Sequence, residues 1–153
     1  MYDCPEQNDL EFTLRRYPDL TIDGFPCDTR NVDRNKRNQM FSKLEEVQRA
    51  TFWYANTCCR PLLIISKKLT SRDLVNMANR WWYELDQSLP PICHGALIAG
   101  LVWQSVMVRP IPDSAAAYTN ISPKSFYRRI LRKDEVVDRF NGIIKDIEIR
   151  LAL

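Results

Sequence analysis

Basic residues gather in one short stretch of the chain, from residue 124 to residue 133. Five of these ten residues are lysine or arginine, and none is acidic. Such side chains bind phosphate groups, and arginine also makes paired hydrogen bonds to guanine. The stretch therefore predicts contact with double-stranded DNA. The candidate contacts are, for base edges, Lys124, Ser125 and Arg128, and, for phosphates, Arg129, Arg132 and Lys133, with Tyr127 beside them.

The residues around this stretch fit a helix-turn-helix that spans Asp113–Arg132. Ala116 is small enough for two helices to touch there, and Asn120 tolerates the left-handed backbone that such a turn requires. Ser122 can cap the second helix, and Pro123 is favoured in its first turn. We expect this second helix to enter the major groove, which makes the protein a DNA-binding transcription regulator. The residues expected to face inward are Ile121, Phe126 and Ile130.

Metal binding and catalysis find little support in the sequence. Five cysteines occur at positions 4, 27, 58, 59 and 93, without a Cys-x-x-Cys pair, and His94 is the only histidine. A tetrahedral zinc site needs four Cys or His ligands, usually in close pairs. Cys93 and His94 are neighbours in sequence, which does not favour a nucleophile–base pair. We predict no metal, no cofactor and no enzymatic activity, with His94 as a core or capping residue.

The elements that must position the basic stretch are predicted to be helices. Apolar residues recur three and four positions apart over about 33–58, 70–85 and 134–153, and Ile92–Val108 is apolar enough to be a central helix. The predicted fold is all-α, a single helical bundle over residues 33–153. An irregular arm, residues 1–32, precedes it. Leu62–Ser66 is predicted to be either a buried strand or an extended segment that crosses the core.

The bulk composition agrees with one globular domain. The chain has 153 residues, of which 45% are hydrophobic, and a formal net charge of +3. The first residues lack the apolar segment of a signal peptide, and Ile92–Val108 is too short and too polar to cross a membrane. We expect a soluble protein of the cytoplasm or nucleus, without membrane contact.

Three segments taken together resemble one cyclin-like repeat of transcription factor IIB and of its archaeal relative, transcription factor B. The segments are residues 69–86, 90–106 and 113–132. The resemblance covers about residues 69–138, and it implies a five-helix cyclin-like core, promoter-DNA contact by the last helix pair, and the transcription machinery as a partner. The matching positions are Leu69, Val75, Ala78, Ala96, Ala99, Gly100, Ala116, Ile121, Ser122, Phe126, and Tyr127 or Arg128.

A second class of function uses other surfaces. Trp81, Trp82 and Tyr83 are consecutive, so a helix cannot bury all three on one face, and an exposed tryptophan is typical of a protein-binding anchor. The apolar stripe of residues 134–153 predicts either packing on the first long helix or a homodimer interface. The alternative function is a helical adaptor that binds a protein through Trp81, Trp82 and the C-terminal helix, with a helix-turn-helix that does not bind DNA.

Overall fold

The structure is a computed structural model that describes residues 4–28, 30–58 and 60–126. Within these residues, three short strands form an antiparallel sheet in the order β1-β3-β2, so the prediction of an all-α fold is wrong. Short 3-10 helices cover Met40–Ser42 and Pro123–Ser125. The helices and strands are α1 (Gln7–Arg16), α2 (Arg34–Gln39), α3 (Leu44–Thr57), β1 (Ser66–Thr70), α4 (Ser71–Leu85), α5 (His94–Trp103), β2 (Val108–Pro110) and β3 (Ala117–Thr119).

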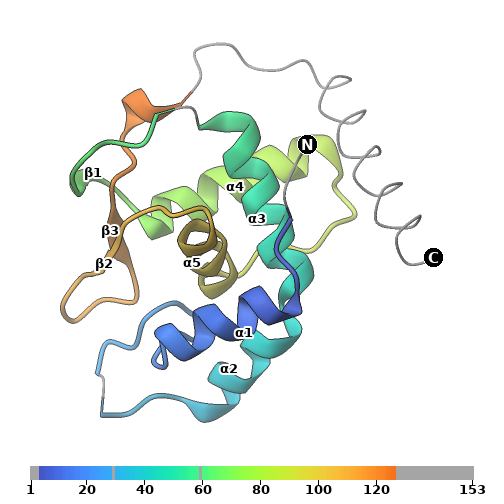
Figure 1. Cartoon of the computed structure of the whole chain (residues 1–153). Coiled ribbons are helices and arrows are strands. Elements are labelled where there is room, and N and C mark those ends of the chain that lie inside the picture. Colours follow the sequence, from blue (N-terminus) through green and yellow to red (C-terminus); the bar gives the residue numbers. More distant parts are fainter. Residues whose placement is uncertain (1–3, 29, 59, 127–153) are drawn as a thin grey trace.

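Helix α5 lies at the centre, between α1, α3 and α4 (Figure 1). All its residues from His94 to Leu101 are buried. Two glycines let neighbours approach closely: a Cβ at Gly95 would collide with the carbonyl oxygen of Thr21, and one at Gly100 would lie 3.0 Å from the Cβ of Ala50. The central helix predicted over Ile92–Val108 is therefore confirmed for His94–Trp103, whereas its last residues leave the helix at Ser105, with φ +63°, and Val108 begins β2. No helix in the described residues is long and apolar enough to cross a membrane.

The predicted helix over about residues 70–85 is also confirmed, as α4. The hydroxyl of Thr70 accepts the N–H of Asp73, and the carboxylate of Asp73 accepts the N–H of Thr70. Two backbone N–H groups at the start of the helix are thus satisfied by side chains. The predicted helix over 33–58 is instead divided. It becomes α2, the 3-10 turn Met40–Ser42 and α3, because Lys43 leaves the helical region at φ −101° and ψ 20°.

The N-terminal segment contains a helix, where an irregular arm was expected. Helix α1 begins after Glu6, whose N–H donates to the carboxylate of Asp9. Leu10 and Leu14, four residues apart, are buried, so α1 belongs to the core. The guanidinium of Arg37, on α2, donates to the carbonyls of Leu14, Tyr17 and Leu20 and so holds the end of α1.

The segment predicted as a helix-turn-helix is a β-hairpin followed by a 3-10 turn. Arg109 of β2 lies opposite Tyr118 of β3, and Asp113, in the connection, has a φ of +58°. Pro110 and Pro112 disfavour helical backbone at Arg109 and Ile111, the residues before them. Pairing with β1 and β2 provides backbone hydrogen bonds instead.

The second half of the predicted motif is not a continuous helix either. Phe126 is extended, with φ −86° and ψ 149°, and it forms an isolated antiparallel bridge with Cys58. A recognition helix running from Pro123 through Phe126 is therefore excluded. The all-α core implied by the resemblance to transcription factor IIB is wrong because β3, in the segment predicted as the first helix of the motif, is the central strand of a sheet.

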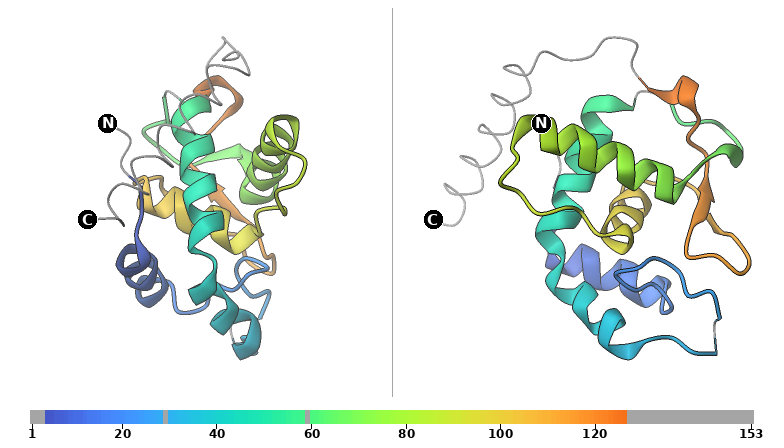
Figure 2. Two further views of the ribbon diagram at one scale, coloured as in Figure 1. Left: turned by 90° about the vertical axis from the view of Figure 1, so that its right-hand side faces the viewer. Right: turned by 180° about the vertical axis from the view of Figure 1, so that it is seen from behind.

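The sheet lies to one side of the helices, at the left of Figure 1 and at the right of the view from behind in Figure 2. Ala117 and Thr119 of β3 are buried against the core, together with Ile121 just beyond the strand. Tyr118, between the two buried residues of β3, is only half-buried. The other face of the sheet is thus open, and it belongs to Tyr118 and its neighbours on β1 and β2.

Candidate nucleic-acid interface

The residues predicted to contact DNA divide into three groups. Lys124 is exposed in the 3-10 turn. Ser125 is fully buried, and its hydroxyl accepts the N–H of Ser122 over 3.0 Å, so it supports the turn and has no surface to offer a base. The remaining predicted contacts lie outside the described residues; they are Tyr127, Arg128, Arg129, Arg132 and Lys133. Residues 134–153, predicted either to pack on the first long helix or to form a dimer interface, also lie outside them.

A different cationic site lies on the open face of the sheet. The ring of Tyr118, on the central strand β3, has a cation from each neighbouring strand beside it. Nζ of Lys67 lies 5.8 Å from the ring centroid and Cζ of Arg109 lies 5.9 Å from it, both within the range of cation–π attraction. We call Lys67, Arg109 and Tyr118 the basic sheet face.

The strand register explains how three residues far apart in sequence come together. Arg109 and Tyr118 are direct partners across β2 and β3, so their side chains leave the sheet on the same side. The pairing of β1 with β3 is interrupted between Ser66 and Thr70. Lys67 occupies this irregular stretch, where the strand is free to turn its side chain toward Tyr118.

The segment that leads into β1 is basic, and the first carboxylate after it, that of Asp73, is bonded to Thr70 at the start of α4. Residues 60–72 include four basic residues and no acidic one. Lys67, Lys68 and Arg109 are exposed, and within the described part of the chain no carboxylate forms an ion pair with any of them. Such a surface attracts anions, and the half-buried ring of Tyr118 adds a flat apolar platform.

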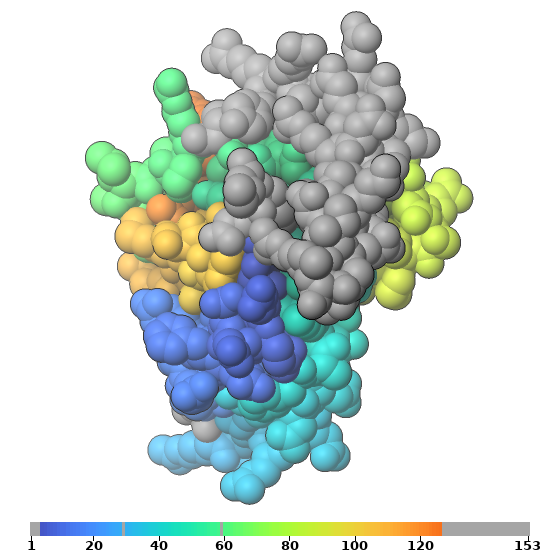
Figure 3. Space-filling model, turned by 45° about the vertical axis from the view of Figure 1, so that its right-hand side comes forward, coloured from blue at the N-terminus to red at the C-terminus, as the bar shows by residue number. Residues whose placement is uncertain are grey.

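Two apolar side chains project beside the basic sheet face. Leu63 is 96% exposed and Ile64 is 73% exposed, so the expectation that Leu62–Ser66 is buried is wrong for these two residues. We call Leu63 and Ile64 the apolar tip. The space-filling view shows the green segment that contains them as a protrusion beyond the gold and orange residues of the hairpin (Figure 3).

The loop that carries the apolar tip is anchored to the segment after β3. The N–H of Leu62 donates to the carbonyl of Asn120 over 2.6 Å, and the side-chain amide of Asn120 donates back to the carbonyl of Leu62 over 2.9 Å. The N–H of Arg60 donates to the carbonyl of Ser125. Leu63 and Ile64 follow the anchored Leu62, and both are exposed.

His94 is a buried, hydrogen-bonded residue at the start of α5, as predicted. Its Nδ1 lies 3.1 Å from the carbonyl of Asp23, which can only accept, so Nδ1 carries the proton. Nε2 then accepts from the hydroxyl of Ser71, and Ser71 Oγ accepts the N–H of Ala117. Burial, helped by the charge of Arg72, lowers the pKa of His94 to about 4.

Ser71 and His94 have the groups of a nucleophile–base pair, but their environment is that of a core. Ser71 has no solvent-exposed surface, and His94 is 7% exposed. Gly24 lies so close that a Cβ there would be 2.8 Å from Nδ1 of the ring. A substrate therefore has no approach to the hydroxyl in this conformation. The pair joins the first turns of α4 and α5 to the turn around Asp23.

Cys93 is a helix cap in this structure. Its sulfur accepts the N–H of Ala96 over 3.4 Å, and burial raises the pKa of its thiol to about 11, so it remains protonated and weakly nucleophilic at neutral pH. Among the described residues, no group of three or more His, Cys, Asp or Glu side chains is arranged to hold a metal ion.

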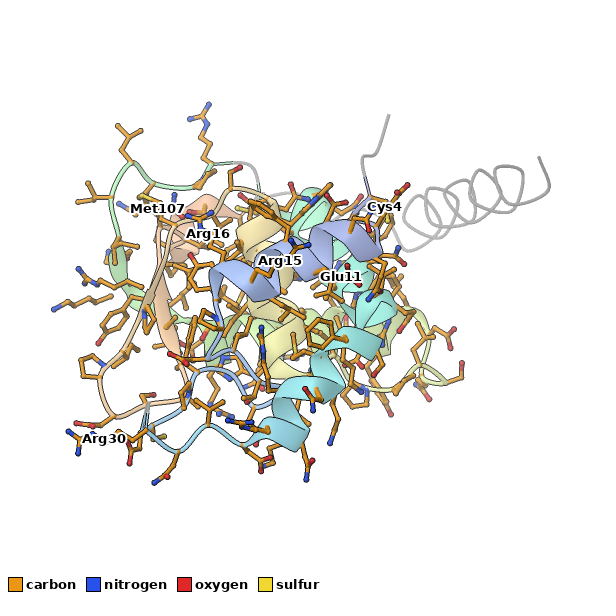
Figure 4. The ribbon with its side chains drawn as sticks, turned by 60° about the horizontal axis from the view of Figure 1, so that its bottom comes forward. Cys4, Glu11, Arg15, Arg16, Arg30 and Met107 are labelled. Atoms are coloured by element: carbon orange, nitrogen blue, oxygen red, sulfur yellow. The ribbon has the colours of Figure 1, made fainter. Side chains whose placement is uncertain are left out.

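An open pocket of about 800 Å³ lies between the segment after α1 and the hairpin connection. It has an aromatic pair, Tyr17 and Phe25, and the carboxylates of Asp19, Asp28 and Asp113 on its wall. A smaller hollow next to it includes Arg16 and Met107, which lie near each other in Figure 4. The three carboxylates make the larger pocket a poor site for a polyanion, in contrast to the basic sheet face.

The aromatic cluster on α4 is mostly core. Trp82 is 3% exposed, and its indole N–H donates to the carbonyl of Arg49 over 3.0 Å. Trp81 is half-buried, edge-on to Trp82 at 5.1 Å, whereas Tyr83 is 60% exposed. One of the three is thus exposed, as predicted, but Trp82 has no free surface for a protein partner.

Sequence reasoning missed the basic sheet face. The available signal was the Lys67–Lys68 pair after an apolar run, but three-residue strands such as β2 and β3 are too short to be recognised by their period. Comparisons of the chain with protein-family models, with curated proteins and with solved structures find no match.

Proposed function

We propose that this protein binds nucleic acid through the basic sheet face. The observation that carries the proposal is the placement of Tyr118 between the cations of Lys67 and Arg109 on an open sheet. A base can stack on the tyrosine ring when one of these long side chains turns away, and the released cation then meets a phosphate. Stacking on an aromatic side chain contributes about 1–3 kcal/mol per base.

Further cations extend the proposed interface. Lys68 and Arg60 are exposed on the same stretch as Lys67, and Lys124 is exposed in the turn that Arg60 contacts through its backbone. The basic residues at 128–133 follow directly in sequence. DNA remains the expected partner, which agrees with the location in the cytoplasm or nucleus expected from the sequence. The proposed mode of binding uses the face of a sheet and not a recognition helix.

The proposal is tested by the salt dependence of binding to a fluorescent DNA oligonucleotide, with Lys67→Ala/Arg109→Ala as the test variant. Each phosphate contact to single-stranded DNA contributes about 0.7 to the slope of log affinity against log salt concentration. We expect the double variant to bind more weakly at low salt and to lose about 1.4 from that slope.

The matched control is Arg34→Ala/Arg80→Ala. Arg34, on α2, and Arg80, on α4, are exposed, and their removal changes the net charge by the same amount. We expect this control to bind nearly as well as the unchanged protein. Equal losses in the two variants would mean that only net charge matters, and the proposed site would be wrong.

A further inference from the structure

The apolar tip calls for a partner, because it exposes two adjacent aliphatic side chains to water. Single exposed apolar residues are ordinary on protein surfaces. Here Leu63 and Ile64 are, at 96% and 73%, the two most exposed large hydrophobic side chains in the described residues. They are also consecutive and project from an anchored loop. Contiguous exposed apolar surface of this kind marks a place of interaction.

The surroundings of the apolar tip define the chemistry of that partner. Arg60 precedes the tip, Lys67 and Lys68 follow it, and residues 60–72 contain no carboxylate. The partner must therefore offer negative charge close to apolar surface. Nucleic acid does so, because its phosphates alternate with flat bases, and aliphatic wedges are known to enter between neighbouring bases.

An anionic membrane surface offers a similar combination, but the structure favours nucleic acid. Tyr118, held between two cations on the adjacent sheet, has the dimensions of a platform for one base. Membrane-surface binding usually uses the broad apolar face of an amphipathic helix. The apolar tip consists of two side chains only, and the elements next to it are polar and cationic.

We infer that the substrate class is single-stranded or locally unstacked nucleic acid, and that the apolar tip inserts against a base next to the one that stacks on Tyr118. This inference rests on the proposed function. Base pairs in a duplex are already stacked, so insertion there must first separate a step, at a cost of a few kcal/mol. Single strands avoid this cost, so they are the preferred form.

The test measures binding of a fluorescent single strand, of the duplex with the same sequence, and of phosphatidylserine-containing vesicles. The variants are Leu63→Ser/Ile64→Ser and the control Phe12→Ser, which changes an exposed aromatic ring on α1. Because all three side chains are exposed, the variants are expected to fold. We expect the unchanged protein to prefer the single strand by about tenfold, and the tip variant to lose at least about fivefold in single-strand affinity. The control should lose nothing.

Several outcomes would overturn the inference, and they are separable. If the tip variant binds the single strand as tightly as the unchanged protein, or if the duplex is preferred, the inference is wrong. The proposed function would still stand if Lys67→Ala/Arg109→Ala weakens binding. If the tip variant loses only vesicle binding, the tip contacts a membrane instead. If the unchanged protein binds neither nucleic acid, the proposed function fails with the inference.

Discussion

The hydroxyl of Ser71 donates a hydrogen bond to Nε2 of His94 over 2.7 Å, and the bond joins the first turns of α4 and α5. The other ring nitrogen of His94 donates to the carbonyl of Asp23. Both ring nitrogens therefore form hydrogen bonds while the ring is neutral. Nδ1 carries the single proton and donates, and Nε2 accepts. A second proton on the ring would face a hydroxyl that is already committed as a donor, inside the core.

The first prediction is a loss of stability between neutral and mildly acidic pH. The pKa of His94 is about 4 in the folded protein, against about 6.5 in an unfolded chain, so the unfolded chain binds the proton first as the pH falls. The free energy of unfolding should decrease by about 1.4 kcal/mol per pH unit below about 6.5, or about 2 kcal/mol at pH 5.

Denaturant unfolding at pH 7, 6 and 5 measures this effect, and His94→Gln serves as the control. Because His94 is the only histidine, the variant should be less stable at pH 7 but should lose most of the pH dependence in this range. The ring also gives a single histidine signal in an NMR titration. A midpoint near 6.5 for that signal would contradict the buried, neutral assignment.

The second prediction separates a core role of Trp82 from a binding role. Trp82→Ala removes a buried ring that packs on Phe52 at 5.6 Å and donates to the carbonyl of Arg49. We expect the free energy of unfolding to decrease by about 3–5 kcal/mol, the usual cost of such a cavity. Tyr83→Ala, at an exposed position on the same helix, should change it by less than about 0.5 kcal/mol.

Chemical denaturation of the two α4 variants side by side provides the measurement. Similar unfolding midpoints for Trp82→Ala and Tyr83→Ala would show that the indole ring does not support the core. The comparison also bears on the adaptor hypothesis, because Trp82 is buried and Trp82→Ala is expected to destabilise the fold itself. Loss of a partner in that variant is not informative unless the variant is shown to be folded.

Much of the helical core could be predicted from the sequence. The spacing of apolar residues and the Thr70–Asp73 capping pair identify α4, and continuous apolar character identifies α5. Both signals are local and extend over ten or more residues. Helix α1 is harder to predict because it has only ten residues and prolines lie close to both of its ends, at positions 5 and 18.

The hairpin could not be predicted by the same means. Three adjacent alanines, Ala115–Ala117, favour a helix, but strand pairing between β1 and β3 links residues about fifty positions apart and has no local signal. The candidate site depends on that pairing, because it brings Lys67 to Tyr118. The cationic character of the sequence could be predicted, whereas the surface that displays it could not.

The third prediction concerns Asn120, which is 6% exposed and connects three segments. Its side-chain oxygen accepts the N–H of Met107 over 2.9 Å, and its side-chain nitrogen donates to the carbonyl of Leu62. Asn120→Ala leaves both backbone groups without this partner, which should lower the free energy of unfolding by about 1–3 kcal/mol. Asn120→Asp keeps the side-chain oxygen that accepts the N–H of Met107 but loses the amide that donates to the carbonyl of Leu62. It should therefore loosen the loop at Leu62 more than the segment at Met107.

Amide hydrogen exchange measures the Asn120 variants at the level of single residues. In Asn120→Ala the N–H of Met107 should exchange faster, whereas in Asn120→Asp it should remain protected. The N–H of Thr119, in the central strand, is the internal reference. Unchanged exchange at Met107 in Asn120→Ala would be incompatible with the observed bond.

The double attachment of Leu62 to Asn120 has a consequence for selectivity. Because Asn120 binds both the N–H and the carbonyl of Leu62, the loop that carries the aliphatic pair is attached directly after the strand that carries the tyrosine ring. Under the proposed function, a ligand that contacts both features at once presents two flat apolar groups, with its anionic groups beside them. Recognition would then depend on the spacing of successive bases along the polymer as well as on its charge.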